Sequence, residues 1–111
     1  MNKIAHVISK NRSKDCIKNL FSTIESRKEK LPQKSYTTSL FKAGLDKISL
    51  KIAEESLEVI QAAQKQTRKR LIEESADLLY HLFVLLAEKK VSLEEVESEI
   101  KKRQKITYEI I

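Results

Sequence analysis

Residues that interrupt helices are almost absent from this chain. Glycine and proline each occur once in 111 residues, at Gly44 and Pro32, and these two residue types most disfavour a helix interior. Leu, Ile, Glu, Lys and Ala supply most of the remaining sequence, which favours helix over strand. A chain of this length forms one domain with a modest core. We therefore expect a single all-α domain.

The apolar periodicity predicts about four helices. The first carries apolar residues at i, i+3, i+4 and i+7, which are Ile17, Leu20, Phe21 and Ile24. It should end before Pro32. The others are expected at residues 45–64, 69–88 and 93–105, with Thr67 as a possible cap and a capping box from Ser92 to Glu95. Short connectors make such helices antiparallel neighbours, which predicts a small up-and-down bundle.

The segment between the first two helices is polar and rich in hydroxyl groups. We expect residues 32–39 to form a loop that ends in a helix cap at Thr38 or Ser39. Residues 40–41 then make a short apolar turn, and Gly44 marks a break or a kink.

The third predicted helix is apolar on more faces than one small bundle can cover. Its second half is almost uninterrupted by polar residues over 78–86. An exposed apolar patch of that size usually marks an interface. We therefore expect a homodimer with this helix near its centre.

Charge and cysteine content limit the partners and the compartment. The formal net charge is +6 with a pI near 9.4, which suits a nucleotide, a nucleic acid or an acidic surface. Lys and Arg are spread along the chain without a helix-turn-helix or aromatic stacking pattern, which argues against nucleic acid. Cys16 is the only cysteine, so we expect a reducing compartment. No apolar run is long enough to span a membrane, and we expect a cytoplasmic protein, with a plastid location left open.

Two carboxylate clusters, one on each of the second and third helices, indicate chemistry. They comprise Glu54, Glu55 and Glu58, and Glu73, Glu74 and Asp77. At about 100° per residue, Glu54 and Glu58 lie about 40° apart, and Glu74 and Asp77 about 60° apart. If the two helices are antiparallel, four or five carboxylates converge and repel one another. A hard divalent cation, Mg²⁺ or Mn²⁺, would remove that repulsion, and such sites usually handle phosphates.

A solvated acidic face is the competing interpretation, because i,i+4 carboxylates are common on helix surfaces. The apolar residues around both clusters disfavour it, since they would leave the carboxylates half buried, where an unpaired charge is costly. A di-iron bundle would need Glu-x-x-His on two helices, whereas the spacing from Asp77 to His81 occurs once. A basic binding module, the remaining alternative, gives no reason for acidic residues to gather.

Several blocks of this sequence resemble phosphoribosyl-ATP pyrophosphohydrolase of histidine biosynthesis. They are Leu40–Ile48, Lys51–Glu55 and Ala76–His81, supported by Leu31–Pro32, Ser35–Thr37 and Val84–Ala87. The resemblance covers roughly residues 19–104 and implies an all-α, MazG-like helical bundle, which we expect a second copy to complete. The family signature, Glu-Glu-x-x-Glu followed by Glu-x-x-Asp, falls on Glu54, Glu55, Glu58, Glu74 and Asp77. Ala53 stands where the family commonly has glycine, and Leu50 where it often has a second lysine, but neither change removes a proposed ligand.

This resemblance also divides the chain and defines its reaction. Residues 1–16 are expected to form an arm outside the resemblance, 17–105 the helical domain, and 106–111 a tail. The implied reaction is hydrolysis of 1-(5-phosphoribosyl)-ATP to 1-(5-phosphoribosyl)-AMP and pyrophosphate, the second step of histidine biosynthesis. No cyclohydrolase-like segment is recognisable, so we expect this step alone. The nearest alternative is a house-cleaning pyrophosphohydrolase acting on canonical or damaged nucleotides.

The implied catalytic residues are the carboxylates. Glu55, Glu58, Glu74 and Asp77 are the expected ligands of Mg²⁺, with Mn²⁺ as the alternative. Glu54 is expected as the base or as an orienting group, and Glu54 and Glu55 could exchange these roles.

The remaining site residues are expected to bind or support the substrate. Lys47 and Lys51 lie one and two turns before the carboxylates and could contact phosphates, or could be ordinary surface charge with Lys51 paired to Glu55. Hydroxyls for the phosphoribosyl phosphate are expected from Ser35, Tyr36 and Thr37. His81, one turn beyond Asp77, is either a core histidine or a support for that carboxylate.

Overall fold

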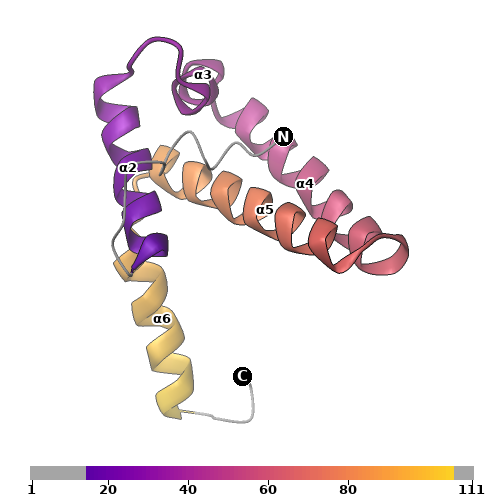
Figure 1. The fold of residues 1–111 in the computed structure, drawn as a ribbon. Coiled ribbons are helices and arrows are strands. Elements are labelled where there is room, and N and C mark those ends of the chain that lie inside the picture. The colour runs from indigo at the N-terminus through magenta and orange to yellow at the C-terminus, as the bar shows by residue number, and fades with distance from the viewer. Residues whose placement is uncertain (1–14, 107–111) are drawn as a thin grey trace.

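The computed structural model describes residues 15–106, which form five α-helices and contain no strand. The helices are α2 (Cys16–Lys30), α3 (Tyr36–Ala43), α4 (Leu45–Lys65), α5 (Arg68–Glu88) and α6 (Leu93–Ile106), as Figure 1 shows. The predicted all-α fold is confirmed, and the four expected helices have nearly their expected bounds. Most of the predicted arm (1–16) and of the predicted tail (106–111) lies outside the described residues, whereas Cys16 begins α2 and Ile106 ends α6. No helix in the described range is long and apolar enough to cross a membrane.

The additional helix, α3, corrects the prediction of a loop over residues 32–39. Its cap is Ser35, not Thr38 or Ser39, and the Ser35 hydroxyl accepts a hydrogen bond from the Thr38 backbone N–H at 3.2 Å. Residues 40–41 belong to the last turn of this helix and do not form a separate turn. Three side chains of α3 are buried, so packing outweighs the modest helix propensity of threonine.

Gly44 separates α3 from α4, which confirms the predicted break. Its φ of 96° lies in a region that side-chain-bearing residues rarely adopt. The Gly44 N–H donates to the carbonyl of Leu40 at 3.0 Å, and its own carbonyl accepts from the Ile48 N–H at 3.1 Å. One residue therefore ends α3 and begins α4, and the chain changes direction there.

The helices α4 and α5 form a hairpin with the most extensive packing in the described fold. Thr67 caps α5, as predicted, and accepts a hydrogen bond from the Arg70 backbone N–H at 3.2 Å. The short connector makes the two helices antiparallel, and they lie side by side in Figure 1. This arrangement sets the carboxylates of one helix opposite those of the other.

The core lies where α2 and α3 pack against this hairpin. Three of the four apolar residues expected on the first helix are buried there, namely Leu20, Phe21 and Ile24. Phe21 meets Phe83 edge-to-face, with ring centroids 5.2 Å apart, an arrangement that aromatic pairs favour.

The last helix begins with the predicted capping box but leaves the bundle. The Ser92 N–H donates to the Glu95 carboxylate at 2.9 Å, and the Glu95 N–H donates to the Ser92 hydroxyl at 3.1 Å. Hydrogen bonds to its carboxylate from the backbone and then from the side chain of Ser92 lower the pKa of Glu95. Leu93 is buried, whereas the rest of α6 extends away from α4 and α5 (Figure 1). The expected four-helix bundle is therefore not closed within one chain over the described residues.

Candidate metal centre

The hairpin brings together three carboxylates from the two predicted clusters. Glu55 and Glu58 on α4 and Glu74 on α5 each offer one oxygen, and these atoms all lie within 4.8 Å of one another. Glu55 is 3% exposed and Glu74 is 5% exposed, whereas Glu58 lies at the surface. The set therefore has a buried base and an open side, and a solvated acidic face does not describe it.

Crowding of these acids changes the protonation of Glu74. A hydrogen bond with Glu58, then burial, then the charge of Glu58 raise the pKa of Glu74 to about 7. The same value of about 7 includes two smaller effects: the charge of Arg70 lowers this pKa, and the charge of Glu55 raises it. A proton between Glu58 and Glu74 thus relieves a repulsion that a divalent cation would also relieve.

The other two predicted carboxylates lie beside this group of three. Asp77 is buried one turn beyond Glu74, and its backbone carbonyl lies 2.8 Å from Nδ1 of His81. Glu54 faces solvent and pairs with Lys51 at 3.4 Å. The assignment of Glu54 as a base remains a prediction.

The predicted substrate lysines differ in their surroundings. Lys47 is exposed and Lys51 is half-buried. Lys51 lies near Glu54 at i+3, and both lysines lie on the same side of α4 as the first carboxylate cluster, as their spacing predicts.

The three predicted hydroxyl residues occupy the N-terminus of α3 and make contacts inside the protein. Ser35 is the cap, and its hydroxyl lies 3.4 Å from Nη1 of Arg27. The Tyr36 hydroxyl lies 3.1 Å from Nε2 of His81. Thr37 is buried and hydrogen-bonds the Tyr80 hydroxyl. Tyr36 and the Ser35 turn are half-buried, so of the three only Thr37 is fully enclosed.

His81 is fully buried and links α3 to the helix that carries Glu74. Because Nδ1 faces a backbone carbonyl, which only accepts, this nitrogen carries the proton and donates it to Asp77. Nε2 then accepts from the Tyr36 hydroxyl. The hydrogen bond from His81 to Asp77 is therefore made to the backbone carbonyl of Asp77.

Sequence reasoning left Arg70 either in a solvated turn or as an aid to phosphate binding, and it did not predict the contact of Arg70 with the carboxylates. Its guanidinium lies 2.8 Å from Glu73 and 3.2 Å from Glu74, so it borders the carboxylate group. The spacing of i and i+4 between Arg70 and Glu74 was the available signal, but many such pairs lie on plain helix surfaces.

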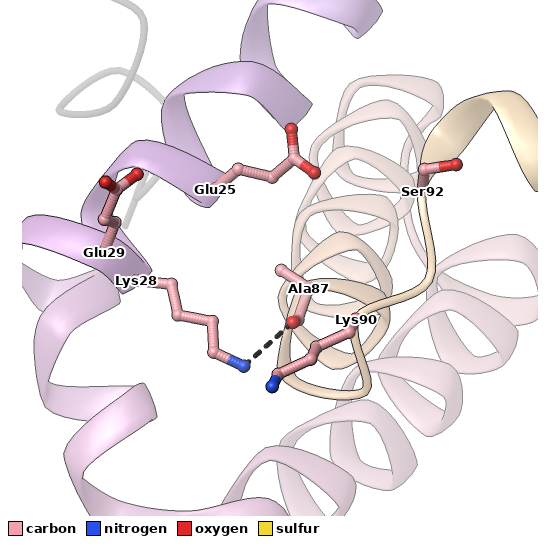
Figure 2. Close-up of a pocket in the computed structure, with 6 residues that line it drawn as sticks. All are labelled: Glu25, Lys28, Glu29, Ala87, Lys90 and Ser92. Carbon is pink, nitrogen blue, oxygen red and sulfur yellow. Dashed lines mark hydrogen bonds between the residues drawn. The ribbon is translucent and has the colours of Figure 1, made fainter.

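A cavity of about 380 Å³ lies at the other end of α5 (Figure 2). Lys28 of α2 reaches across it and donates to the carbonyls of Ala87 and Glu88, each at 3.0 Å. Its wall also includes Glu25, Glu29 and Lys90. Lysine at a helix C-terminus satisfies the last carbonyls, so Lys28 caps α5 at this cavity, which is separate from the carboxylate group.

The all-α fold, with carboxylates gathered on two antiparallel helices, agrees with the class that the sequence resemblance implied, the all-α pyrophosphohydrolases of nucleoside triphosphates. Comparison with known proteins narrows this class. The phosphoribosyl-ATP pyrophosphohydrolase family matches residues 17–104, and the chain belongs to this family. The predicted activity, phosphoribosyl-ATP diphosphatase in histidine biosynthesis, is thereby confirmed.

Individual relatives agree with this assignment. The chain is 49% identical over 88 residues to a phosphoribosyl-ATP pyrophosphatase of Clostridium botulinum, covering 79% of this chain and 80% of that protein. It is 51% identical over 80 residues to one from Leptospira biflexa, covering 72% and 87%. It also matches a bifunctional histidine-biosynthesis protein of Bacteroides thetaiotaomicron, at 44% over 92 residues, covering 83% of this chain and 45% of that protein. These matches favour the histidine pathway over the house-cleaning alternative and over a binding module.

Proposed function

We propose that the chain cleaves the α–β phosphoanhydride of 1-(5-phosphoribosyl)-ATP at a divalent cation held by Glu55, Glu58, Glu74 and Asp77. The observation that supports this most is the approach of three carboxylates within 4.8 Å, two of them buried. Cleavage of that bond releases 1-(5-phosphoribosyl)-AMP and pyrophosphate.

The donor set fits a hard cation. Carboxylate oxygens are the ligands that Mg²⁺ and Mn²⁺ prefer, and a cation would relieve the crowding of acids that raises the pKa of Glu74. Asp77 lies one turn from Glu74 on the same helix and would complete the set. When bound, the cation would neutralise phosphate oxygens and lower the pKa of a water molecule.

Residues of the chain would then position and activate the reactants. Glu54 is our choice for the carboxylate that takes a proton from the attacking water, with Glu55 as the alternative. The water oxygen forms a new bond to one of the two phosphorus atoms of the α–β phosphoanhydride. The bond from that phosphorus to the bridging oxygen breaks, and this oxygen leaves with the other phosphorus. Lys47 and Lys51 lie on the adjoining face of α4, where their ammonium groups would balance the charge of the polyphosphate.

The N-terminus of α3 would hold the phosphoribosyl end of the substrate. Ser35 and Tyr36 remain partly accessible there, and helix N-termini favour phosphate groups. Thr37 would act through its bond to Tyr80, which fixes the helix in place. His81 would hold Tyr36 in one orientation.

Pyrophosphate release from phosphoribosyl-ATP, measured with Mg²⁺ and with EDTA, tests the proposal. ATP and dNTPs are compared under the same conditions. We expect metal-dependent release from phosphoribosyl-ATP alone. Release that persists in EDTA would contradict the proposed cation, and equal turnover of ordinary nucleotides would support the house-cleaning alternative.

We further propose that the active form is a homodimer and that the enzyme is cytoplasmic. The second apolar face of α5 supports the dimer, because Ile72 and Leu82 are large apolar residues left exposed in the single chain. The location is a prediction from the single cysteine, Cys16, which is a free thiol.

A further inference from the structure

Arg70 occupies the edge of the carboxylate group in an unusual way for a surface arginine. One nitrogen of its guanidinium, Nη1, lies 2.8 Å from Glu73, and the other, Nη2, lies 3.2 Å from Oε1 of Glu74. Glu74 is buried whereas the Arg70 side chain is 47% exposed. A partly exposed cation therefore contacts a buried anion that belongs to the proposed metal set.

The guanidinium and a divalent cation need the same partner. Nη2 of Arg70 lies 3.2 Å from the Glu74 carboxylate, so Arg70 supplies part of the positive charge that a cation would supply at this site. An ion pair with a partly exposed arginine is weak, whereas a hard cation with several carboxylate ligands is held more strongly. Binding of the cation should therefore displace the guanidinium from Glu74.

The displaced guanidinium stays close to the site. Its hydrogen bond to Glu73, one residue before Glu74, keeps the side chain at the rim. Guanidinium groups bind phosphate through two parallel hydrogen bonds, and a polyphosphate on the cation would lie within this region of the hairpin. The neighbouring residues Arg68 and Lys69 are exposed and have no acidic partner among the described residues.

We propose that Arg70 is a substrate-binding residue that neutralises Glu74 until the divalent cation arrives and then contacts the polyphosphate of the substrate. This inference rests on the proposed metal site. Arg70 would therefore lower the affinity of the protein for the free cation and raise its affinity for the substrate.

Calorimetric titration with Mn²⁺ alone tests the first half. Arg70→Gln should bind Mn²⁺ about threefold more tightly than the wild type, the size of effect expected for an exposed ion pair. Arg68→Gln removes the same charge from the same turn without removing a contact to Glu74, and it should leave Mn²⁺ affinity unchanged. Both titrations are made at physiological salt, which screens the effect of more distant charges on Mn²⁺ affinity.

Steady-state kinetics at saturating Mg²⁺ tests the second half. Arg70→Gln should raise KM for phosphoribosyl-ATP about tenfold with a smaller change in kcat, as expected for loss of a charged hydrogen bond to substrate. Circular dichroism checks that α5 is intact, and Arg70→Lys should restore only part of the KM because it lacks the planar fork.

The outcomes separate this inference from the proposed function. Unchanged or weaker Mn²⁺ binding by Arg70→Gln, or an unchanged KM, would overturn the role of Arg70 while the metal site stands. Absence of Mn²⁺ binding by the wild-type protein would overturn the proposed metal site and this inference together.

Discussion

Glu74 links the stability of this protein to pH. Its pKa is raised from 4.5 to about 7 in the folded chain, so the folded state binds more protons than the unfolded state between these values. The resulting stabilisation is complete below about pH 4.5 and is lost as the pH rises through 7. We expect the metal-free protein to lose roughly 1–3 kcal/mol between pH 4.5 and 8. Urea unfolding in EDTA measures this loss.

The Glu74→Gln variant is the control for this pH effect, since it lacks the titrating group. Its free energy of unfolding should depend less on pH than that of the wild type. Parallel pH curves for the two proteins would assign the dependence to other residues. Near pH 8, Mn²⁺ should restore the free energy of unfolding that the wild type loses at high pH. The bound cation then compensates the charge of Glu74 in place of the lost proton.

A substitution of Glu58, the α4 carboxylate next to Glu74, tests whether the carboxylate group is catalytic. Glu58→Gln should lower turnover of phosphoribosyl-ATP by roughly 100-fold or more, because it removes a proposed ligand. The fold should survive since Glu58 is exposed, and the metal-free protein should become more stable as repulsion falls. Turnover and helicity are measured together, with the exposed Glu97→Gln on α6 as the matched control. A loss of helicity would indicate a structural role.

At the scale of single residues, the sequence predicts which side chains form the carboxylate group better than it predicts which side chains they contact. The one-turn spacings from Glu55 to Glu58 and from Glu74 to Asp77 place carboxylates on one face by helix geometry alone. The contact of Arg70 with Glu74 depends on side-chain conformation. The bond between Tyr36 and His81 depends on where α3 docks, and no local spacing encodes that position.

At the scale of the helix, Lys28 caps an element to which it does not belong. It donates to two carbonyls at the C-terminus of α5 and lies 3.8 Å from the Glu88 carboxylate, where positive charge is favourable. We expect Lys28→Met to lower the free energy of unfolding by about 1–2 kcal/mol. Lys30→Met, an exposed lysine on the same helix, should change it little. Equal effects of the two variants in urea unfolding would refute the capping role.

The buried pair of Thr37 and Tyr80 holds α3 against α5. Burial raises the pKa of Tyr80 to about 12, with the hydrogen bond between Tyr80 and Thr37 acting in the opposite direction. Thr37→Val should cost about 1–3 kcal/mol, because it leaves the Tyr80 hydroxyl buried without this partner. Adding Tyr80→Phe should recover part of that loss, and the double-mutant cycle measures the coupling. Purely additive losses would show that the two hydroxyls act independently.

This pair also explains why α3 escapes sequence analysis. Threonine and serine near Ser35 favour caps and loops in isolation, and the eight-residue helix is too short to be stable alone. Burial of Thr37 and Leu40 against the hairpin supplies the missing stability. The longer helices α4 and α5 carry their periodicity over 21 residues each, so their bounds could be predicted closely.

At the scale of the whole molecule, the single chain leaves large apolar side chains exposed on both helices of the hairpin. On α5, Ile72 is 59% exposed and Leu82 is 39% exposed, and on α4 Leu57 is 55% exposed. The α6 helix extends away from the hairpin (Figure 1), and these three side chains remain exposed in the single chain. A second copy would cover such a surface through a symmetric contact, which is the basis of the proposed dimer.

Aspartate substitutions on each helix locate the interface. If α5 lies at its centre, Leu82→Asp should convert a dimer to a monomer, because a charge buried there would lose its hydration. Leu31→Asp is the matched control, since Leu31 is also 39% exposed but lies beyond the end of α2. Light scattering measures the mass, and circular dichroism confirms that the monomer remains helical. Dissociation by Leu57→Asp alone would move the interface to α4, and an unchanged mass for both variants would contradict an interface through either residue.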